Sequence, residues 1–219
     1  KPFTVIDDGW SVNPCAGPWE PNEKFGDMAK IAAEFKKIGV KPGIWIRPLC
    51  DKKLEKLHPE WCLSRINDGD TNNEPSYCLD PTVPEVREYV RSTVRKMTEW
   101  GYELIKHDYT TYDLFGSFGC MLNGKITAKD GWSFHDESKT SAEIVSELYG
   151  IIREAACDAV VIACNAVSHL SAGIFEVYRT GDDTSGRLWS RTRAYGVNTL
   201  AFRLCQNNAF YKIDADCVG

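Results

Sequence analysis

Short apolar runs alternate along this chain with longer segments in which apolar residues recur every three or four positions. The short runs predict strands at residues 3–6, 44–46, 103–108, 160–164, 174–178 and 211–213. The longer segments predict helices at residues 25–38, 84–100, 141–156 and 188–204. Strands with helices between most of them imply a parallel sheet whose crossover connections are right-handed.

Two long segments interrupt this alternation. Residues 49–78 contain a turn-forming run at 67–70 and are predicted to be an excursion over the surface. A second, glycine-rich excursion is predicted over residues 110–132. The whole chain, residues 1–219, is predicted to form a single domain, because its length permits one sizeable core.

Both an open doubly wound sheet and a (β/α)8 barrel fit the alternation. The glycine-rich phosphate loops of nucleotide-binding sheets are absent, since Gly124 and Lys125 lack the surrounding motif. Nearly every predicted strand ends in Asp, Arg or Cys, and barrel enzymes place their chemistry at the carboxyl ends of their strands. The favoured fold is therefore an α/β protein of the (β/α)8 TIM barrel type.

Charge and cysteine usage narrow the choice of partners. The 219 residues include 31 acidic and 26 basic side chains, and the formal net charge of −5 disfavours a nucleic acid or an anionic membrane. No apolar run approaches the ~18 residues of a membrane-spanning helix. Nine cysteines without metal-site spacing predict free thiols, with Cys164 and Cys205 buried, and a disulfide framework is the alternative. The chain starts at Lys1 and not at a methionine. The lack of a signal peptide therefore gives no information about the compartment in which the protein works.

Lys106 and Asp108 alternate along one predicted strand and therefore share a face. A cation beside a carboxylate keeps it ionised, as a nucleophile at neutral pH must be, and a lysine also donates hydrogen bonds to a substrate hydroxyl. A structural ion pair at the end of the strand is the alternative. His107 points to the other face and is expected to be a hydrogen-bonded residue behind the site.

A pair of acidic residues, Asp7 and Asp8, follows the first predicted strand. Two adjacent carboxylates suit either a divalent metal ion or a pair of sugar hydroxyls. The nearby Trp10 favours a sugar, because an indole ring packs on the C–H groups of a pyranose. A turn formed by Asp-Asp-Gly is the alternative.

Asp182 and Asp183 follow the fifth predicted strand. One of them suits the role of a general acid opposite Asp108, because glycoside hydrolysis with retention uses two carboxyl groups about 5–5.5 Å apart. The alternative is a turn, or an N-cap for the helix that starts near Leu188.

Several motifs resemble those of the melibiase-type α-galactosidases, a family of retaining glycosidases that also includes α-N-acetylgalactosaminidases. They are VIDDGW at residues 5–10, PGIW at 42–45, LDPTVPEVR at 79–87, IKHDY at 105–109, Cys164, RTGDDT at 179–184 and DADC at 214–217. The matches run in the family's order over almost the whole chain.

This resemblance implies a role for each matching residue. Asp108 is expected to be the nucleophile, and Asp183 the acid/base, since the spacing from Arg179 selects it over Asp182. The residues expected to bind the sugar are Asp7, Asp8, Trp10, Trp45, Lys106, Cys164 and Arg179. No metal ion or cofactor is implied.

The chain also departs from the family pattern. Arg47 stands where some members carry an acidic residue, and Ala215 replaces a proline. The family's first barrel strand is expected to lie before Lys1 and the eighth after Gly219. An incomplete barrel is therefore expected, with exposed edges that favour self-association.

The resulting hypothesis is a retaining hydrolase that cleaves terminal α-D-galactosides, or close relatives, through a covalent glycosyl-enzyme. One alternative is a Mg²⁺-dependent barrel enzyme acting on phosphorylated substrates, with Asp7, Asp8 and Asp108 as ligands. The other is a sugar-binding module that has no catalytic activity.

Overall fold

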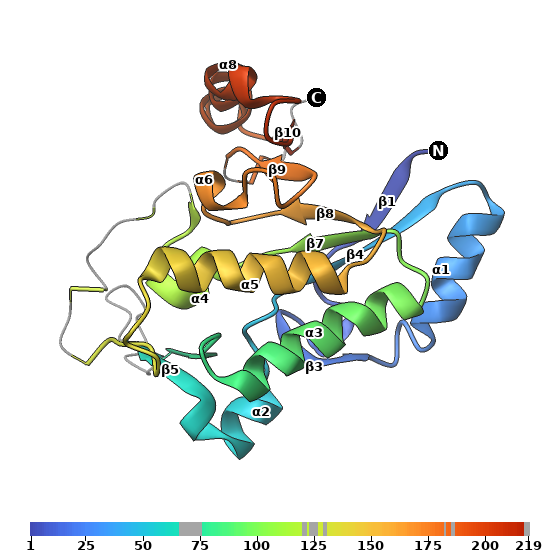
Figure 1. Cartoon of the computed structure of the whole chain (residues 1–219). Coiled ribbons are helices and arrows are strands. Elements are labelled where there is room, and N and C mark those ends of the chain that lie inside the picture. The colour runs from blue at the N-terminus through green and yellow to red at the C-terminus, as the bar shows by residue number, and fades with distance from the viewer. Residues whose placement is uncertain are drawn as a thin grey trace.

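The computed structural model describes residues 1–65, 76–119, 122, 127–128, 131–181, 183–184 and 187–216. Its centre is a parallel six-stranded sheet, curled like half of a barrel (Figure 1). In spatial order the strands are β1 (Phe3–Ile6), β4 (Lys41–Ile46), β7 (Leu104–His107), β8 (Val160–Ala163), β9 (Val177–Arg179) and β10 (Lys212–Asp214). This order follows the chain without reversal. A doubly wound sheet reverses its strand order at a switch point, so that alternative is excluded for the described strands.

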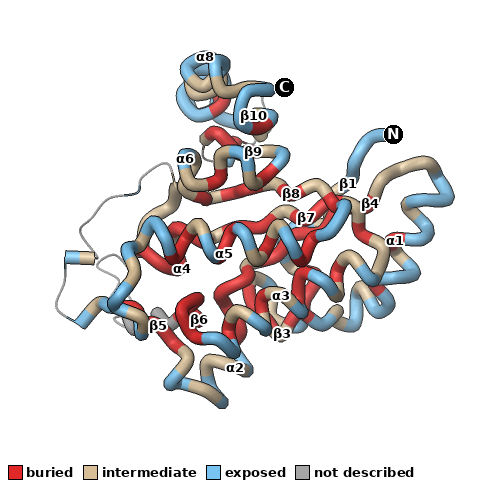
Figure 2. The backbone as a smooth tube through the Cα atoms, viewed as in Figure 1, coloured by how far each residue is buried: buried red, intermediate tan, exposed pale blue. Residues whose placement is uncertain are grey.

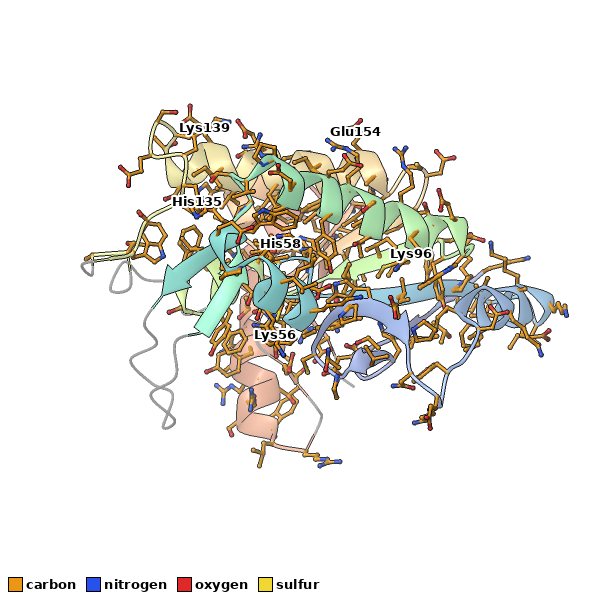
Figure 3. All side chains as sticks on the ribbon, turned by 90° about the horizontal axis from the view of Figure 1, so that it is seen from below. Lys56, His58, Lys96, His135, Lys139 and Glu154 are labelled. Atoms are coloured by element: carbon orange, nitrogen blue, oxygen red, sulfur yellow. The ribbon has the colours of Figure 1, made fainter. Side chains whose placement is uncertain are left out.

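Helices connect successive strands of this sheet. They are α1 (Met28–Lys37), α3 (Pro84–Glu99), α5 (Ser141–Ala155), α6 (Ser168–Ser171) and, before β10, the consecutive segments α7 (Trp189–Arg191), η3 (Thr192–Asn198), α8 (Thr199–Arg203) and η4 (Leu204–Gln206). Helices α3 and α5 pack against each other over one face of the sheet (Figure 1). Figure 3 shows the same layer from below, with Lys139 and Glu154 near opposite ends of α5.

The core lies between the sheet and these helices. The central strands β4 and β7 are mostly buried, whereas the edge strand β1 is exposed to intermediate along its length (Figure 2). Val86, Val90, Val94 and Met97 of α3 are fully buried, as their helical spacing predicts. Gly43 in β4 allows the strands to approach, because a Cβ atom there would lie 3.0 Å from Val5 and 3.1 Å from Leu104.

Residues 49–78 differ from the predicted surface excursion. They contain α2 (Lys52–Leu57), η1 (Pro59–Trp61), β5 (Cys62–Arg65) and β6 (Ser76–Leu79), and β5 and β6 pair antiparallel. Leu49, Leu63 and Leu79 are fully buried, and the Leu79 N–H donates to the Leu49 carbonyl at 2.8 Å. Burial of these side chains makes the segment part of the core. The turn predicted at residues 67–70 lies outside the described residues.

Several smaller elements also differ from the sequence pattern. A hairpin of β2 (Ser11–Asn13) and β3 (Ala16–Pro21) was not predicted, and α4 (Thr110–Phe115) begins the segment predicted as an excursion. The fifth strand starts at Val177 rather than Ile174, because the Ile174 N–H closes a turn onto the Ser171 carbonyl. The helix predicted over 188–204 is divided among α7, η3 and α8.

The described cysteines are free thiols, as predicted. Cys164 is buried, but Cys205 is exposed on the segment after α8, so the prediction of burial was wrong for Cys205. Among the described residues, no helix has both the length and the apolar character needed to cross a membrane.

Candidate active site

A hollow of about 570 Å³ lies at the carboxyl ends of the six parallel strands. Its walls are formed by Asp7, Asp8, Trp45, Lys106, Asp108, Tyr109, Phe118, Asn165, Arg179, Asp183, Arg191 and Asp216. Every strand of the sheet contributes to it, either from its last residues or from the residues that follow. Parallel strands bring their carboxyl ends to the same edge, so residues that are far apart in the sequence meet there.

Asp108 follows β7 and is held by three hydrogen-bond donors. Its Oδ1 accepts the Tyr109 main-chain N–H at 2.6 Å and the Asn165 amide at 2.6 Å. Its Oδ2 accepts the Trp45 indole N–H at 3.0 Å. An ionised carboxylate only accepts hydrogen bonds, so this all-donor shell matches a charged and fixed Asp108.

Lys106 forms an ion pair with Asp7, across the sheet, rather than with its strand neighbour Asp108. Its Nζ lies 2.6 Å from Asp7 Oδ2. Burial alone would lower the pKa of Lys106, but the hydrogen bond to Asp7 and the negative charges of Asp7 and Asp108 raise it above its usual value. Lys106 is therefore a permanent cation between two carboxylates.

Asp8 lies beside Asp7 in the wall of the hollow, and its side chain contacts a thiol. Cys15 Sγ lies 3.1 Å from Asp8 Oδ2. Burial, together with the hydrogen bond and the negative charge of Asp8, raises the pKa of Cys15 to about 11. The thiol is thus a neutral donor, and it fixes one oxygen of Asp8.

Arg179 ends β9 and binds two carboxylates at once. Its Nη2 lies 2.8 Å from Asp183 Oδ1 and 3.0 Å from Asp216 Oδ2. The guanidinium is almost fully buried, whereas the Asp183 side chain is 84% exposed. Asp183 therefore faces the hollow from a solvent-accessible position. Asp182, the alternative acid, lies outside the described residues.

Two predicted sugar-binding residues lie behind the wall and do not form part of it. Trp10 is fully buried, donates its indole N–H to the Trp45 carbonyl at 2.9 Å and packs against Trp19 and Trp100. Trp10 is thus a core residue in this structure, which corrects its predicted place at the sugar. Cys164 is also buried, with its Sγ 3.7 Å from Arg179 Nη1. Burial and the charge of Asp108 raise the pKa of Cys164 well above its usual value, so the thiol is neutral.

His107 is fully buried between the rings of Tyr149 and Phe175, on the helix side of β7. Its Nδ1 lies 3.3 Å from Thr110 Oγ1, but its Nε2 has no hydrogen-bond partner among the described residues. The expectation of a fully hydrogen-bonded histidine was therefore only half right. Burial lowers the pKa of His107 to about 4.

Five wall residues were not predicted as site residues: Tyr109, Phe118, Asn165, Arg191 and Asp216. Three of them carried a signal in the sequence. Tyr109 and Asn165 directly follow Asp108 and Cys164, and Asp216 belongs to the DADC motif. Phe118 lies in an irregular segment after α4, and Arg191 ends α7, where the predicted helix over 188–204 is divided. No local sequence pattern marks either residue.

The hollow holds five carboxylates and three cations, a formal excess of two negative charges at neutral pH. In the part of the chain that the structure describes, no three His, Cys, Asp or Glu side chains are placed to share a metal ion. Asp7 and Asp108 instead accept hydrogen bonds from Lys106 and from Trp45 and Asn165. Such an arrangement of alternating donors and acceptors suits the hydroxyl groups of a sugar.

Comparison with known proteins supports the sequence motifs. The sequence model of the family described as Melibiase matches residues 2–114, slightly more than half of the chain. The chain belongs to the melibiase family. The matching region contains Asp7, Trp45, Lys106 and Asp108, while Asp183 lies beyond it.

Two curated relatives of this melibiase chain are α-galactosidases. Over 135 residues it is 28% identical to the bifunctional alpha-galactosidase/sucrose kinase AgaSK of Mediterraneibacter gnavus, which covers 57% of this chain and 14% of that protein. Over 96 residues it is 28% identical to an alpha-galactosidase of Escherichia coli, which covers 39% of this chain and 14% of that protein. The chain thus spans only a small part of these relatives.

Solved structures share the fold over nearly the whole chain. The alpha-galactosidase of Thermus thermophilus, in complex with p-nitrophenyl alpha-D-galactopyranoside, has a TM-score of 0.67 at 23% identity and covers 98% of this chain and 44% of its own. A GH27 β-L-arabinopyranosidase of Geobacillus stearothermophilus has a TM-score of 0.62 at 16% identity. The match covers 98% of this chain and 52% of that protein. At these identities the likeness establishes the fold.

Proposed function

We propose that this melibiase chain carries the site of a retaining hydrolase that cleaves terminal α-D-galactosides or close relatives. The observation that carries the proposal is the contrast between two carboxylates in one hollow. Asp108, after β7, is buried and held by three donors, whereas Asp183, after the carboxyl end of β9, is exposed. Retaining hydrolysis needs these two roles, a fixed nucleophile and a carboxyl group that exchanges protons with solvent.

In the proposed reaction, Asp108 attacks the anomeric carbon and displaces the leaving group to form a covalent glycosyl-enzyme. Asp183 gives its proton to the departing oxygen, and it then removes a proton from the water that hydrolyses the intermediate. Asp183 must be protonated for the first step. Arg179 Nη2 contacts both Asp183 and Asp216, and it therefore positions the Asp183 carboxyl group at the wall of the hollow.

Recognition of the sugar is assigned to the β1 and β7 side of the hollow. Asp7 and Asp8 offer acceptors, and Lys106 offers donors, to neighbouring hydroxyl groups. The Lys106 cation also attracts the negative charges of Asp7 and Asp108. Trp45 lines the same wall but is almost fully buried, and its contribution there is the indole N–H that it donates to Asp108. We further propose that the sheet belongs to a (β/α)8 barrel, and that self-association would involve its edge strands β1 and β10.

The test is substitution of the proposed nucleophile. Asp108→Asn keeps the size of the side chain but removes its charge, and we expect turnover of p-nitrophenyl α-galactoside to fall more than about 1,000-fold. Asp158→Asn, an exposed carboxylate outside the hollow, is the matched control and should retain full activity. Proton NMR should show that the wild-type chain first releases the α anomer of galactose.

Other outcomes of this experiment would support the alternatives. Substantial hydrolysis by Asp108→Asn, or release of the β anomer, would refute the retaining assignment. Galactose binding by calorimetry without any turnover would favour a binding module. Loss of activity on chelation with EDTA, restored by Mg²⁺, would favour the metal-dependent enzyme.

A further inference from the structure

An ion pair outside the proposed catalytic residues lies directly beneath the segment that follows Asp108. Arg47, just after β4, faces Asp113 of α4, which is fully buried. The Arg47 Nε lies 3.0 Å from both Asp113 oxygens, and Nη2 lies 2.5 Å from Oδ1. A fork-like contact of this kind fixes the plane of the guanidinium as well as its position.

The same guanidinium supports the ring of Tyr109. Arg47 Cζ lies 4.4 Å from the centre of that ring, a cation–π contact at short range. The Asp113 N–H also donates to the Tyr109 carbonyl at 2.8 Å. Tyr109 is therefore held by Asp113 in two ways, through its main chain and through Arg47.

Tyr109 needs such support because of its backbone. Its φ angle is +66°, in the left-handed region that residues with a Cβ atom rarely adopt. In this conformation its N–H reaches Asp108 Oδ1 at 2.6 Å. If Tyr109 relaxed to a negative φ while α4 stayed in place, the peptide plane that carries this N–H would have to rotate, and its hydrogen bond to Asp108 would be lost.

We infer that the Arg47–Asp113 ion pair is a positioning device for Asp108, which acts by holding Tyr109 in its left-handed conformation. The inference rests on the proposed function, in which Asp108 is the nucleophile. Arginine suits the role because its planar, permanently charged group can bind a carboxylate along its edge and an aromatic ring on its face at the same time. A lysine ammonium offers neither the fork nor the flat face.

The direct test observes the Tyr109 amide and does not depend on catalysis. Labelling with ¹⁵N-tyrosine gives signals from the nine tyrosines of the chain, and the signal lost in Tyr109→Phe identifies Tyr109. We expect its exchange with solvent to become at least about 10-fold faster in Arg47→Met, and also in Arg47→Lys. The control is Arg153→Met on α5, which breaks a more exposed ion pair with Glu176 and should leave the Tyr109 amide unchanged.

A kinetic test follows if the chain is active. Arg47→Met should lower kcat for an activated aryl α-galactoside about 10- to 100-fold, while inhibition by galactose changes less than about threefold. Glycine adopts the left-handed conformation without support, so Arg47→Met should have little further effect in a Tyr109→Gly background.

These outcomes separate the two proposals. Unchanged Tyr109 exchange in a folded Arg47→Met protein, or fully additive losses in the double variant, would overturn the positioning role. If Arg47→Met does not fold, Asp113→Asn is measured instead, with the same expectation and the same contrary result. A wild-type chain without hydrolase activity would refute the proposed function, and the amide measurement would still decide whether Arg47 controls Tyr109.

Discussion

The chemistry of single residues in the hollow depends on neighbours that come from other strands. Asp108 accepts hydrogen bonds from Trp45 of β4 and from Asn165 after β8, on either side of β7. Asp183, by contrast, is exposed and pairs with Arg179 at the end of β9. The two aspartates therefore suit the two proposed roles. Asp108, enclosed by donors, suits a fixed nucleophile, and Asp183, open to water, suits a group that exchanges protons.

This difference predicts how Asp183 acts on leaving groups. In Asp183→Ala, we expect kcat/KM for an unactivated disaccharide to fall about 100- to 10,000-fold, because its leaving oxygen must be protonated. The loss for p-nitrophenyl α-galactoside should be much smaller, since nitrophenolate leaves without a proton. Parallel rate measurements on both substrates check this expectation. Equal losses on the two substrates would exclude Asp183 as the acid and would point to Asp182.

Helices and strands formed at their predicted places where the sequence pattern that predicts them lies within a few neighbouring positions. Strand β1, the strand at Ile44 and the helices α3 and α5 formed at the predicted places, because apolar periodicity and helix-start residues are properties of neighbouring positions. The hairpins β2–β3 and β5–β6 were missed. Their pairing depends on burial against the rest of the chain, as at Leu63 and Leu79.

A helix start offers a prediction at this scale. The Thr140 hydroxyl accepts the Glu143 N–H, and the Glu143 carboxylate accepts the Thr140 N–H at 2.8 Å, which together form a capping box before α5. Thr140→Ala should therefore lower the free energy of unfolding by about 1 kcal/mol in urea denaturation. Ser146→Ala, in the middle of the same helix, is the control. A Thr140→Ala protein as stable as the wild type would show that the box contributes nothing.

The stability of the whole molecule is linked to one buried histidine. His107 is enclosed by Tyr149 and Phe175 from the neighbouring layer, and burial lowers its pKa from 6.5 to about 4. In the unfolded chain His107 binds a proton below about pH 6.5. In the folded chain it stays neutral until the pH falls to about 4. The unfolded state thus binds more protons in this window, so stability must fall as the pH falls through it.

Between pH 7 and pH 5 this linkage should lower the free energy of unfolding by about 2 kcal/mol. Urea denaturation at a series of pH values measures it. His107→Gln removes the titrating group, so its stability should change less over the same range, whereas His135→Gln, on an exposed residue, should keep the wild-type slope. An undiminished slope in His107→Gln would mean that other groups cause the acid sensitivity.

The sequence by itself determined the alternation of elements, the class of the fold and the positions of Asp7, Asp108 and Arg179 at the ends of strands. These features are local, since each depends on residues a few positions apart. The order of the motifs was sufficient to indicate the family.

Only the tertiary structure decided which of these residues meet. Lys106 pairs with Asp7, 99 positions away, and not with Asp108 on its own strand end. Trp10 turns into the core, and Arg179 divides its charge between Asp183 and Asp216. Such contacts depend on strand register and on the curl of the sheet, because a shift of one residue would send each side chain to the opposite face.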